Sequence, residues 1–324
     1  MLPKSATSRV RFTLLSLTCI LLACYLFFPK KETSHSPAQT EFKKISDVGH
    51  ASHADYIFLQ DTEGKEWIYK QIVEQSPDDQ IVIVLESVAA EMAKAVKIPL
   101  NQVRLISANE AFPHSFLASY PGSLHLKVQG KSVEDSSPWG DFDIHQKIRS
   151  PFLIARKGPL PPEEVGLRRE VIQNMAKHPD LAKIVALDTY LGNNDRSNPN
   201  VFYDQSSNTF HGIDMGSCLI GNLAESAREK IQNFTTNDTP FSKEELAGLT
   251  HYSQALQSLL SKFPPTETIT LLDHALKEAG FVPENSVLWN EDVERKVRKW
   301  KLAIEENYNS TKSLVTLLES LNGN

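Results

Sequence analysis

The sequence predicts a two-lobed α+β fold, in which a small β-rich lobe with one helix precedes a larger, mainly helical lobe. Three observations favour it. Segments 55–60 and 66–73 are rich in β-branched and aromatic residues and flank a turn that contains Gly64. The second half of the chain places apolar residues at helical spacing. The composition, 40% hydrophobic and 23% charged over 324 residues, is that of a globular protein with a full core.

The chain divides by composition into successive segments. These are a basic flank at 1–11, a transmembrane anchor or export signal at 12–28, a polar stem at 29–47, the small lobe at 48–122, and the large lobe at 123–324 with a loop or insertion at 129–165.

The run from Phe12 to Phe28 is uncharged and lies between basic residues. Its length is at the lower limit for a membrane-spanning helix, so we expect a single-pass N-terminal anchor in a membrane. The basic residues of the two flanks slightly favour an N-terminus on the inner side, and the side of the membrane stays open.

The charge pattern and the cysteines disfavour two classes of protein. Residues 1–50 hold seven Lys and Arg and three Asp and Glu, so with a net charge of -6 the remaining chain carries about -10. Such an acidic body binds a phosphate backbone poorly, and we expect no nucleic-acid partner. Cys19 and Cys24 lie in the apolar run and leave Cys218 alone in the body, which disfavours a disulfide-stabilised secreted domain.

The small lobe is expected to run strand, strand, helix, strand, strand. After the first two strands, Glu86, Ala89 and Ala93 recur at helical spacing, and Ile98-Pro99 ends that helix. Two further strands are expected at 103–107 and 116–120, with Tyr120-Pro-Gly122 ending the second.

The large lobe is expected to be mostly helical after a polar, Pro-bearing stretch. The apolar periodicity predicts helices at 167–175, 181–191, 241–262 and 266–279, and a helical face from Trp289 to Ile304.

The stretch from Leu187 to Leu219 carries the most chemistry. Asp195 is followed five positions later by Asn200, and two short strands at 201–203 and 209–213 then deliver Asp214. Phosphoryl transfer needs a carboxylate that orients the attacking hydroxyl and oxygen ligands for a metal ion, and these three residues supply them. The alternative is an ordinary turn, which Asn and Asp form on their own.

Two motifs, Leu191-Gly-Asn-Asn-Asp195-Arg-Ser-Asn-Pro-Asn200 and Phe210-His-Gly-Ile-Asp214-Met-Gly216, resemble the catalytic and metal-binding loops of phosphatidylinositol 3- and 4-kinases. They are also similar to those of the wider atypical-kinase superfamily. The resemblance implies a protein-kinase-like fold that uses ATP and Mg²⁺, with Mn²⁺ as a possible substitute. It implies that Asp195 is the catalytic base, Asn200 a metal ligand and Asp214 the main magnesium ligand.

The same resemblance implies a lysine on a small-lobe strand and a glutamate on the next helix. Lys70 lies within the segment 66–73 and Glu86 opens the helix that follows. Lys70 is then expected to act in catalysis and to hold the nucleotide phosphates, and Glu86 is expected at the cofactor site to hold that lysine. The alternatives are an exposed edge-strand lysine and a solvated charge in a first helical turn, and Glu91 competes with Glu86 for the role.

Four more residues are expected at the nucleotide. Gly49 and Ser52 occupy the place of a phosphate-covering loop, although a plain linker fits them as well. Arg196 and Ser197 follow the catalytic base, and Ser197 stands where phosphatidylinositol kinases commonly have His.

The sequence therefore predicts a membrane-tethered kinase that phosphorylates a hydroxyl of a lipid, phosphatidylinositol, or of a protein. Residues 219–234, expected to face the acceptor, mix Arg228 and Lys230 with Glu225 and Glu229, which disfavours a highly phosphorylated headgroup. The alternatives are a pseudokinase that serves as a nucleotide-binding interaction module, and an AMP transferase on the same fold.

Overall fold

The computed structural model describes residues 42–50, 53–133, 162–196, 198–236 and 240–322. The chain divides into the units Met1–Phe42 and Lys43–Asn324, and every element below belongs to the second unit. Two predicted site residues, Ser52 and Ser197, lie outside the described residues.

The expected membrane anchor needs a correction. None of the helices in the described part of the chain combines the length and the apolar character that a membrane crossing requires. The predicted segment 12–28 lies outside the described residues. The single-pass anchor, and the membrane location that followed from it, therefore have no support.

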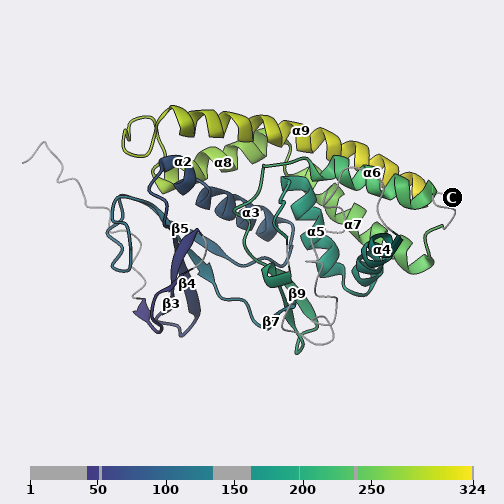
Figure 1. Ribbon diagram of the computed structural model, residues 1–324, viewed down its shortest axis with the longest axis horizontal. Helices are drawn as coiled ribbons and strands as arrows, with labels where there is room; N and C mark the ends of the chain where they lie inside the picture. The colour runs from purple at the N-terminus through teal and green to yellow at the C-terminus, as the bar shows by residue number, and fades with distance from the viewer. Residues whose placement is uncertain (1–41, 51–52, 134–161, 197, 237–239, 323–324) are drawn as a thin grey trace, which may run out of the picture. The chain divides into compact units, whose positions relative to one another are not determined.

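An antiparallel sheet forms the first lobe, with the strand order β1-β3-β4-β6-β5 and β2 paired to β3 (Figure 1). The sheet begins inside the predicted stem, because Lys43 and Lys44 pair with the end of β3. Helix α3 lies between this sheet and α8. The elements are β1 (Lys43–Lys44), β2 (Gly49–His50), β3 (Ala54–Gln60), β4 (Glu66–Ile72), α2 (Pro77–Gln80), α3 (Ile83–Ala95), β5 (Val103–Ile106) and β6 (Gly122–Leu126).

The predicted hairpin forms because its turn satisfies its own backbone. Asp61 Oδ1 accepts hydrogen bonds from the N–H groups of Glu63 and Lys65, and Asp61 Oδ2 accepts one from Trp67 Nε1. Gly64 has a φ of 82°, a left-handed conformation that glycine adopts without strain. The turn thereby fixes the register that pairs Tyr56 with Lys70.

The strand expected at 116–120 is wrong, and β6 begins at Gly122 instead. The N–H groups of Phe116 and Leu117 donate to Oε1 of Gln71, a buried side chain of β4, rather than to a neighbouring strand. Gln71 Nε2 donates in turn to the carbonyls of Leu117 and Tyr120. One side chain therefore fixes the loop that covers the outer face of the sheet.

The second lobe is built around α5, whose side chains from Ile184 to Leu191 are all buried. It packs against α4, α6, α7 and α9, and the long α9 runs along α8, α7 and α6 (Figure 1). The predicted two-lobed α+β fold is confirmed. The helices are α4 (Pro162–Lys177), α5 (Pro179–Leu191), α6 (Leu223–Thr236), α7 (Lys243–Lys262), α8 (Pro265–Ala279) and α9 (Glu291–Asn322).

A small antiparallel sheet in this lobe carries the predicted catalytic segment, from Asp195 to Asp214. It has the order β7-β8-β9 and comprises β7 (Lys131–Ser132), β8 (Val201–Asp204) and β9 (Thr209–Gly212), with the 3-10 turn η3 (Asn198–Asn200) before β8. Val201 pairs with Gly212, so Asn200 and the residues after β9 lie at the same end of the sheet.

Replacing Gln71 by Ala tests how the loop at 116–121 is held. The substitution leaves the N–H groups of Phe116 and Leu117 and the carbonyls of Leu117 and Tyr120 without their Gln71 partner. We expect the free energy of unfolding to fall by about 3 kcal/mol in chemical denaturation. Gln75→Ala, at an exposed position just after the same strand, is the matched control and should stay within about 0.5 kcal/mol of the wild type. Equal effects of the two substitutions would contradict this role of Gln71.

Candidate active site

Lys70, Glu86 and Asp214 come from three separate elements and form one ion cluster. Lys70 lies on β4, and its Nζ donates to Oε1 of Glu86 on α3 at 2.9 Å. The same Nζ donates to Oδ1 of Asp214, after β9, at 3.3 Å. Glu86 is 3% exposed, whereas the side chains of Lys70 and Asp214 are 23% and 39% exposed. The cluster therefore opens to solvent on the side of Lys70 and Asp214.

The competing candidate Glu91 does not join this cluster. Its side chain is exposed and lies near Lys94 one turn further along α3. The structure thus brings Glu86, and not Glu91, to Lys70.

The backbone at Asp214 aims its carboxylate at Lys70. Asp214 has a φ of 55°, a left-handed conformation that few residues other than Gly, Asn and Asp adopt. Two residues on, a Cβ atom at Gly216 would lie 3.4 Å from Glu86 Oε1 and 3.7 Å from Asp214 Oδ1. Glycine there keeps the space beside the two carboxylates clear.

The Lys70 ammonium group and the Asp214 carboxylate stabilise each other's charged forms. Burial favours a lower pKa for Lys70, but Glu86 and Asp214 outweigh it and raise the pKa above the ordinary lysine value. Burial also acts to raise the pKa of Asp214, and Lys70 reverses that effect and lowers it. Lys70 therefore stays cationic and Asp214 anionic at neutral pH, as phosphate binding and metal binding require.

Asp195 and Asn200 are joined to this cluster by a chain of hydrogen bonds. The N–H of Asp195 donates to Oδ1 of Asn193 at 3.1 Å, and Asn200 Nδ2 donates to the Asp195 carbonyl at 2.8 Å. The N–H of Ile213 donates to the Asn200 carbonyl at 3.0 Å, directly before Asp214. The side chain of Asp195 lies at an exposed position. The structure thus brings the predicted base and both predicted metal ligands to one place.

Arg196 was expected to bind the cofactor, and the structure places its guanidinium group among buried protein groups. Its Nε and Nη2 donate to the two carboxylate oxygens of Asp188 on α5, at 2.8 and 2.9 Å. Its Nη1 donates at 2.6 Å to the carbonyls of both Asn200 and Ile213. Arg196 therefore fixes the predicted catalytic segment to α5.

Gly49 has a packing role in the structure. It pairs with Tyr56, which in turn pairs with Lys70, so Gly49 lies two strands away from the lysine. A Cβ atom at Gly49 would lie 2.4 Å from the Tyr56 ring, which only glycine avoids. A contact between Gly49 or Ser52 and a nucleotide stays a prediction, as does one by Ser197.

Sequence reasoning missed Asp188 and Asn193, which hold the predicted catalytic segment. Asn193 Nδ2 donates to Asp188 Oδ1 at 2.9 Å, and both residues are fully buried. Asp188 lies within the apolar stretch of α5, where a carboxylate is costly unless it is paired. That signal could have identified Asp188, whereas nothing in the spacing singles out Asn193.

The donor atoms fit a magnesium ion that arrives with a nucleotide. Asp214 offers a carboxylate and Asn200 its Oδ1, and oxygen atoms are the ligands that Mg²⁺ prefers. Neither here nor at any other place in the described residues is a group of three or more His, Cys, Asp or Glu side chains placed to hold a metal. Mg²⁺ is commonly held by one or two protein ligands together with substrate phosphates, and this pair matches that pattern.

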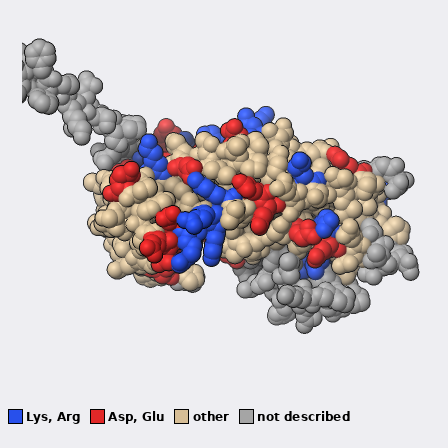
Figure 2. Space-filling model, turned by 90° about the horizontal axis from the view of Figure 1, so that it is seen from above, with Lys and Arg blue, Asp and Glu red and all other residues tan. Residues whose placement is uncertain are grey.

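Several charged groups on the surface pair with one another. Figure 2 shows Lys and Arg gathered in one area with Asp and Glu beside them. On α9, Arg298 donates to Glu294 at 2.8 Å and Lys301 lies 2.7 Å from Asp273 of α8. These cations stabilise the helix surface and define no separate site.

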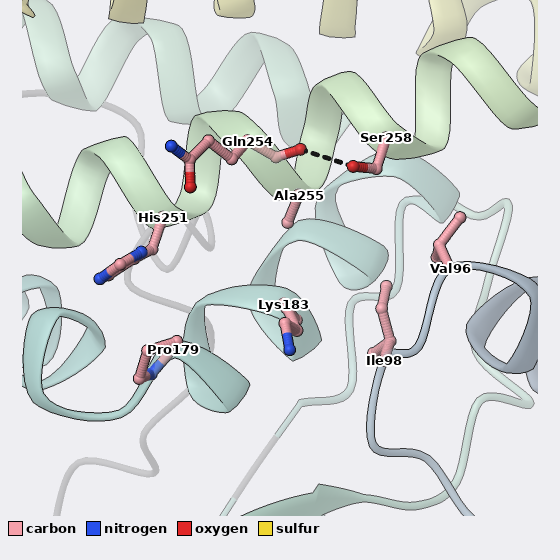
Figure 3. Close-up of a pocket in the computed structure, with 8 residues that line it drawn as sticks. All are labelled: Val96, Ile98, Pro179, Lys183, His251, Gln254, Ala255 and Ser258. Atoms are coloured by element: carbon pink, nitrogen blue, oxygen red, sulfur yellow. Dashed lines mark hydrogen bonds between the residues drawn. The ribbon is translucent and has the colours of Figure 1, made fainter.

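A half-open pocket of about 130 Å³ lies apart from the ion cluster, between the end of α3, the start of α5 and α7 (Figure 3). Val96, Ile98 and Ala255 give it apolar walls. Ser258 Oγ donates to the Gln254 carbonyl within α7, so that hydroxyl is already engaged. None of the predicted site residues lines this pocket.

Comparisons with known proteins find kinases among solved structures. No protein-family model and no curated protein matches the sequence. The proinflammatory kinase CtkA of Helicobacter pylori matches with a TM-score of 0.42 and 13% identity, over 87% of this chain and 96% of that one. A complex of Rio2 kinase from Chaetomium thermophilum with ADP, Mg²⁺ and phosphoaspartate matches with a TM-score of 0.38 and 13% identity, over 82% of this chain and 72% of that one. The Golgi casein kinase matches with a TM-score of 0.40 and 12% identity, over 86% of this chain and 73% of that one.

The TM-scores of all three matches are below 0.5. At such low scores and identities, no residue role is transferred from them. The specific likeness to phosphatidylinositol 3- and 4-kinases stays a prediction from the two motifs.

Replacing Asp188 by Ala tests the buried ion pair. The change leaves the Arg196 guanidinium group buried without its counter-charge, and we expect the free energy of unfolding to fall by about 3–5 kcal/mol. Asp292→Ala is the matched control, because Asp292 pairs with Arg295 on the exposed surface of α9 and should contribute less than about 1 kcal/mol. Similar effects of the two substitutions in urea denaturation would contradict the central place of Asp188.

Proposed function

We propose that this chain is an ATP- and Mg²⁺-dependent phosphotransferase that moves the γ-phosphoryl group of ATP to the hydroxyl of an acceptor. The contact of Lys70 Nζ with both Glu86 and Asp214 carries the proposal. Lys70 and Asp214 are 144 positions apart in the sequence and belong to different lobes. A lysine, a glutamate and an aspartate joined in this way are the parts that a kinase uses to hold the phosphates and the metal.

Lys70 is the residue that binds the α- and β-phosphates. Glu86 keeps its ammonium group in place from the buried side of the cluster. The longer hydrogen bond, from Lys70 Nζ to Asp214, breaks when phosphate oxygens approach from the solvent-exposed side of the cluster. Asp214 is then free to serve as a metal ligand.

Asp214 and Asn200 would hold the magnesium ion. Bound there with the nucleotide, the ion neutralises the charge that develops on the transferring group. The chain's own contribution is placement, because Arg196 fixes the carbonyls of Asn200 and Ile213 and so keeps the two ligands side by side.

Asp195 is the residue that takes the proton. Its carboxylate accepts the proton of the acceptor hydroxyl as the hydroxyl oxygen forms its bond to the γ-phosphorus. The bond from that phosphorus to the oxygen bridging the β- and γ-phosphates breaks, and ADP leaves with the electron pair. The exposed position of Asp195 gives an acceptor access from solvent.

The acceptor is a hydroxyl of phosphatidylinositol or of a protein. The two motifs favour a phosphatidylinositol kinase-like activity, whereas the membrane tether that favoured a lipid has no support. In α6, Arg228 pairs with Glu225 and the Lys230 side chain is buried. Neither cation is placed as a receptor for a highly phosphorylated headgroup, so an acceptor with few phosphates is preferred.

Asp195→Asn and Asp214→Asn test the chemistry in the full chain. Asn tolerates the left-handed backbone of Asp214, so the second substitution removes a charge and spares the fold. With phosphatidylinositol vesicles and a protein mixture as separate acceptors, we expect Asp195→Asn to lower kcat by about 10²–10⁴-fold. Asp214→Asn should abolish the magnesium dependence of ATP binding. Asp273→Asn, at an exposed position on α8, is the control and should behave as the wild type.

The outcomes separate the proposed activity from its alternatives. Failure of the folded wild-type chain to bind Mg·ATP, by calorimetry with and without a chelator, would contradict the proposal. Binding without transfer to either acceptor would indicate a nucleotide-binding module. Mass spectrometry of the modified acceptor would reveal an adenylyl group if the chain transfers AMP.

A further inference from the structure

A buried histidine holds the second carboxylate oxygen of Glu86. While Glu86 Oε1 accepts from Lys70, His125 Nε2 lies 3.2 Å from Glu86 Oε2. His125 is on β6, and its neighbour Ser123 pairs with Lys70 across the sheet, so all three side chains share one face. Ser123 Oγ lies 2.8 Å from the same His125 nitrogen. The contacts of His125 with Glu86 and Ser123 have no part in the proposed transfer step.

The surroundings of His125 fix which nitrogen carries its proton. Asn101 Nδ2 lies 3.0 Å from His125 Nδ1, and an amide nitrogen can only donate. Nδ1 must therefore accept, which leaves the proton on Nε2, facing Glu86 and Ser123. Burial, the largest influence, lowers the pKa of His125, and Lys70 acts in the same direction against Glu86 and Asp214. A neutral ring with its proton on Nε2 satisfies both of its nitrogens.

Asn101 also contacts the strand that leads to Asp214. Its backbone N–H donates to the Gly212 carbonyl at 3.3 Å, and the Gly212 N–H donates to the Pro99 carbonyl at 3.0 Å. A Cβ atom at Gly212 would lie 3.0 Å from Leu100, so glycine permits this close approach. Gly212 ends β9 two residues before Asp214. The segment after α3 is therefore bound to the second lobe by its backbone and to His125 by a side chain.

These contacts close a ring that passes through both lobes. It runs from Lys70 to Glu86, His125 and Asn101, then through the backbone from Gly212 to Asp214, and back to Lys70. A buried carboxylate is costly unless both of its oxygens have partners. With Lys70 alone, the Glu86 carboxylate could turn about its last side-chain bond, and the His125 ring lies 3.2 Å from the oxygen that would move.

We propose that His125 is a positioning residue: as the neutral Nε2–H tautomer held by Asn101, it fixes Glu86 relative to Asp214 and thereby sets how tightly Lys70 binds the phosphates of ATP. This inference rests on the proposed function. It identifies two buried residues, His125 and Asn101, whose effect reaches the nucleotide only through Glu86 and the end of β9.

Mg·ATP affinity of full-length variants tests the proposal. His125→Phe keeps an aromatic ring but removes both nitrogens, and we expect the Kd for Mg·ATP to rise about three- to tenfold, the effect of one hydrogen bond. Asn101→Ala keeps its backbone bonds and should raise Kd in the same range, although Asn101 touches neither Glu86 nor Lys70. The double variant should be no weaker than His125→Phe alone, because both changes break one ring.

Two further variants separate positioning from a general loss of structure. His125→Gln retains an amide nitrogen that can take the place of Nε2, and it should recover most of the affinity. His274→Phe, at an exposed position on α8, is the matched control and should keep the wild-type Kd. A purely structural defect would lower the folded fraction seen by circular dichroism and the number of binding sites without raising Kd. Wild-type Kd values for His125→Phe and Asn101→Ala would overturn the proposal.

A second measurement tests the tautomer of His125 in the absence of nucleotide. Nitrogen-15 NMR of labelled histidines, assigned with His125→Gln, reports the tautomer directly. We expect the neutral Nε2–H form at pH 7 in the wild type and its loss in Asn101→Ala. A protonated ring or an Nδ1–H tautomer would overturn the inference. If the wild type shows this tautomer but does not bind Mg·ATP, the proposed function fails, and with it the effect of His125 on nucleotide affinity.

Discussion

The buried ion pair between Asp188 and Arg196 is the interaction on which the rest of the candidate site depends. It joins the central helix α5 to the predicted catalytic segment through two hydrogen bonds, and the same guanidinium group holds the carbonyls of Asn200 and Ile213. Asn193 adds a link from Asp188 to the backbone of Asp195. The segment has little regular structure of its own. Its geometry is therefore set by its hydrogen bonds to α5, a helix that is buried along most of its length.

A second constraint acts between the lobes, where charges taken out of water must be compensated. Lys70 belongs to the sheet lobe and finds its two carboxylates on α3 and after β9. Because one ammonium group balances carboxylates from both lobes, the relative placement of the lobes is tied to the state of the site. A bound nucleotide would bring further negative charge and so change that balance at the point where the two lobes meet.

The sequence predicted the site residues best where residue type and order both carry information. Lys70, Glu86 and Asp214 fall in the expected elements, and the structure places them in contact. The Arg196 guanidinium group binds Asp188, and spacing cannot tell whether a cation faces a ligand or a buried carboxylate. The strand expected at 116–120 failed because a distant side chain, Gln71, takes the hydrogen bonds that a neighbouring strand would otherwise supply. His125 and Asn101 belong to no periodic pattern, and only the packed structure brings them to Glu86.

The left-handed backbone of Asp214 bears on how such a chain could change over evolutionary time. Most side chains would pay a conformational cost at this position in addition to any lost chemistry, whereas Asn and Gly would not. Asn and Gly are each one nucleotide substitution from Asp. A descendant that abandoned catalysis could therefore exchange this residue and keep the fold intact, so inactive relatives of the chain would be expected to carry Asn or Gly here.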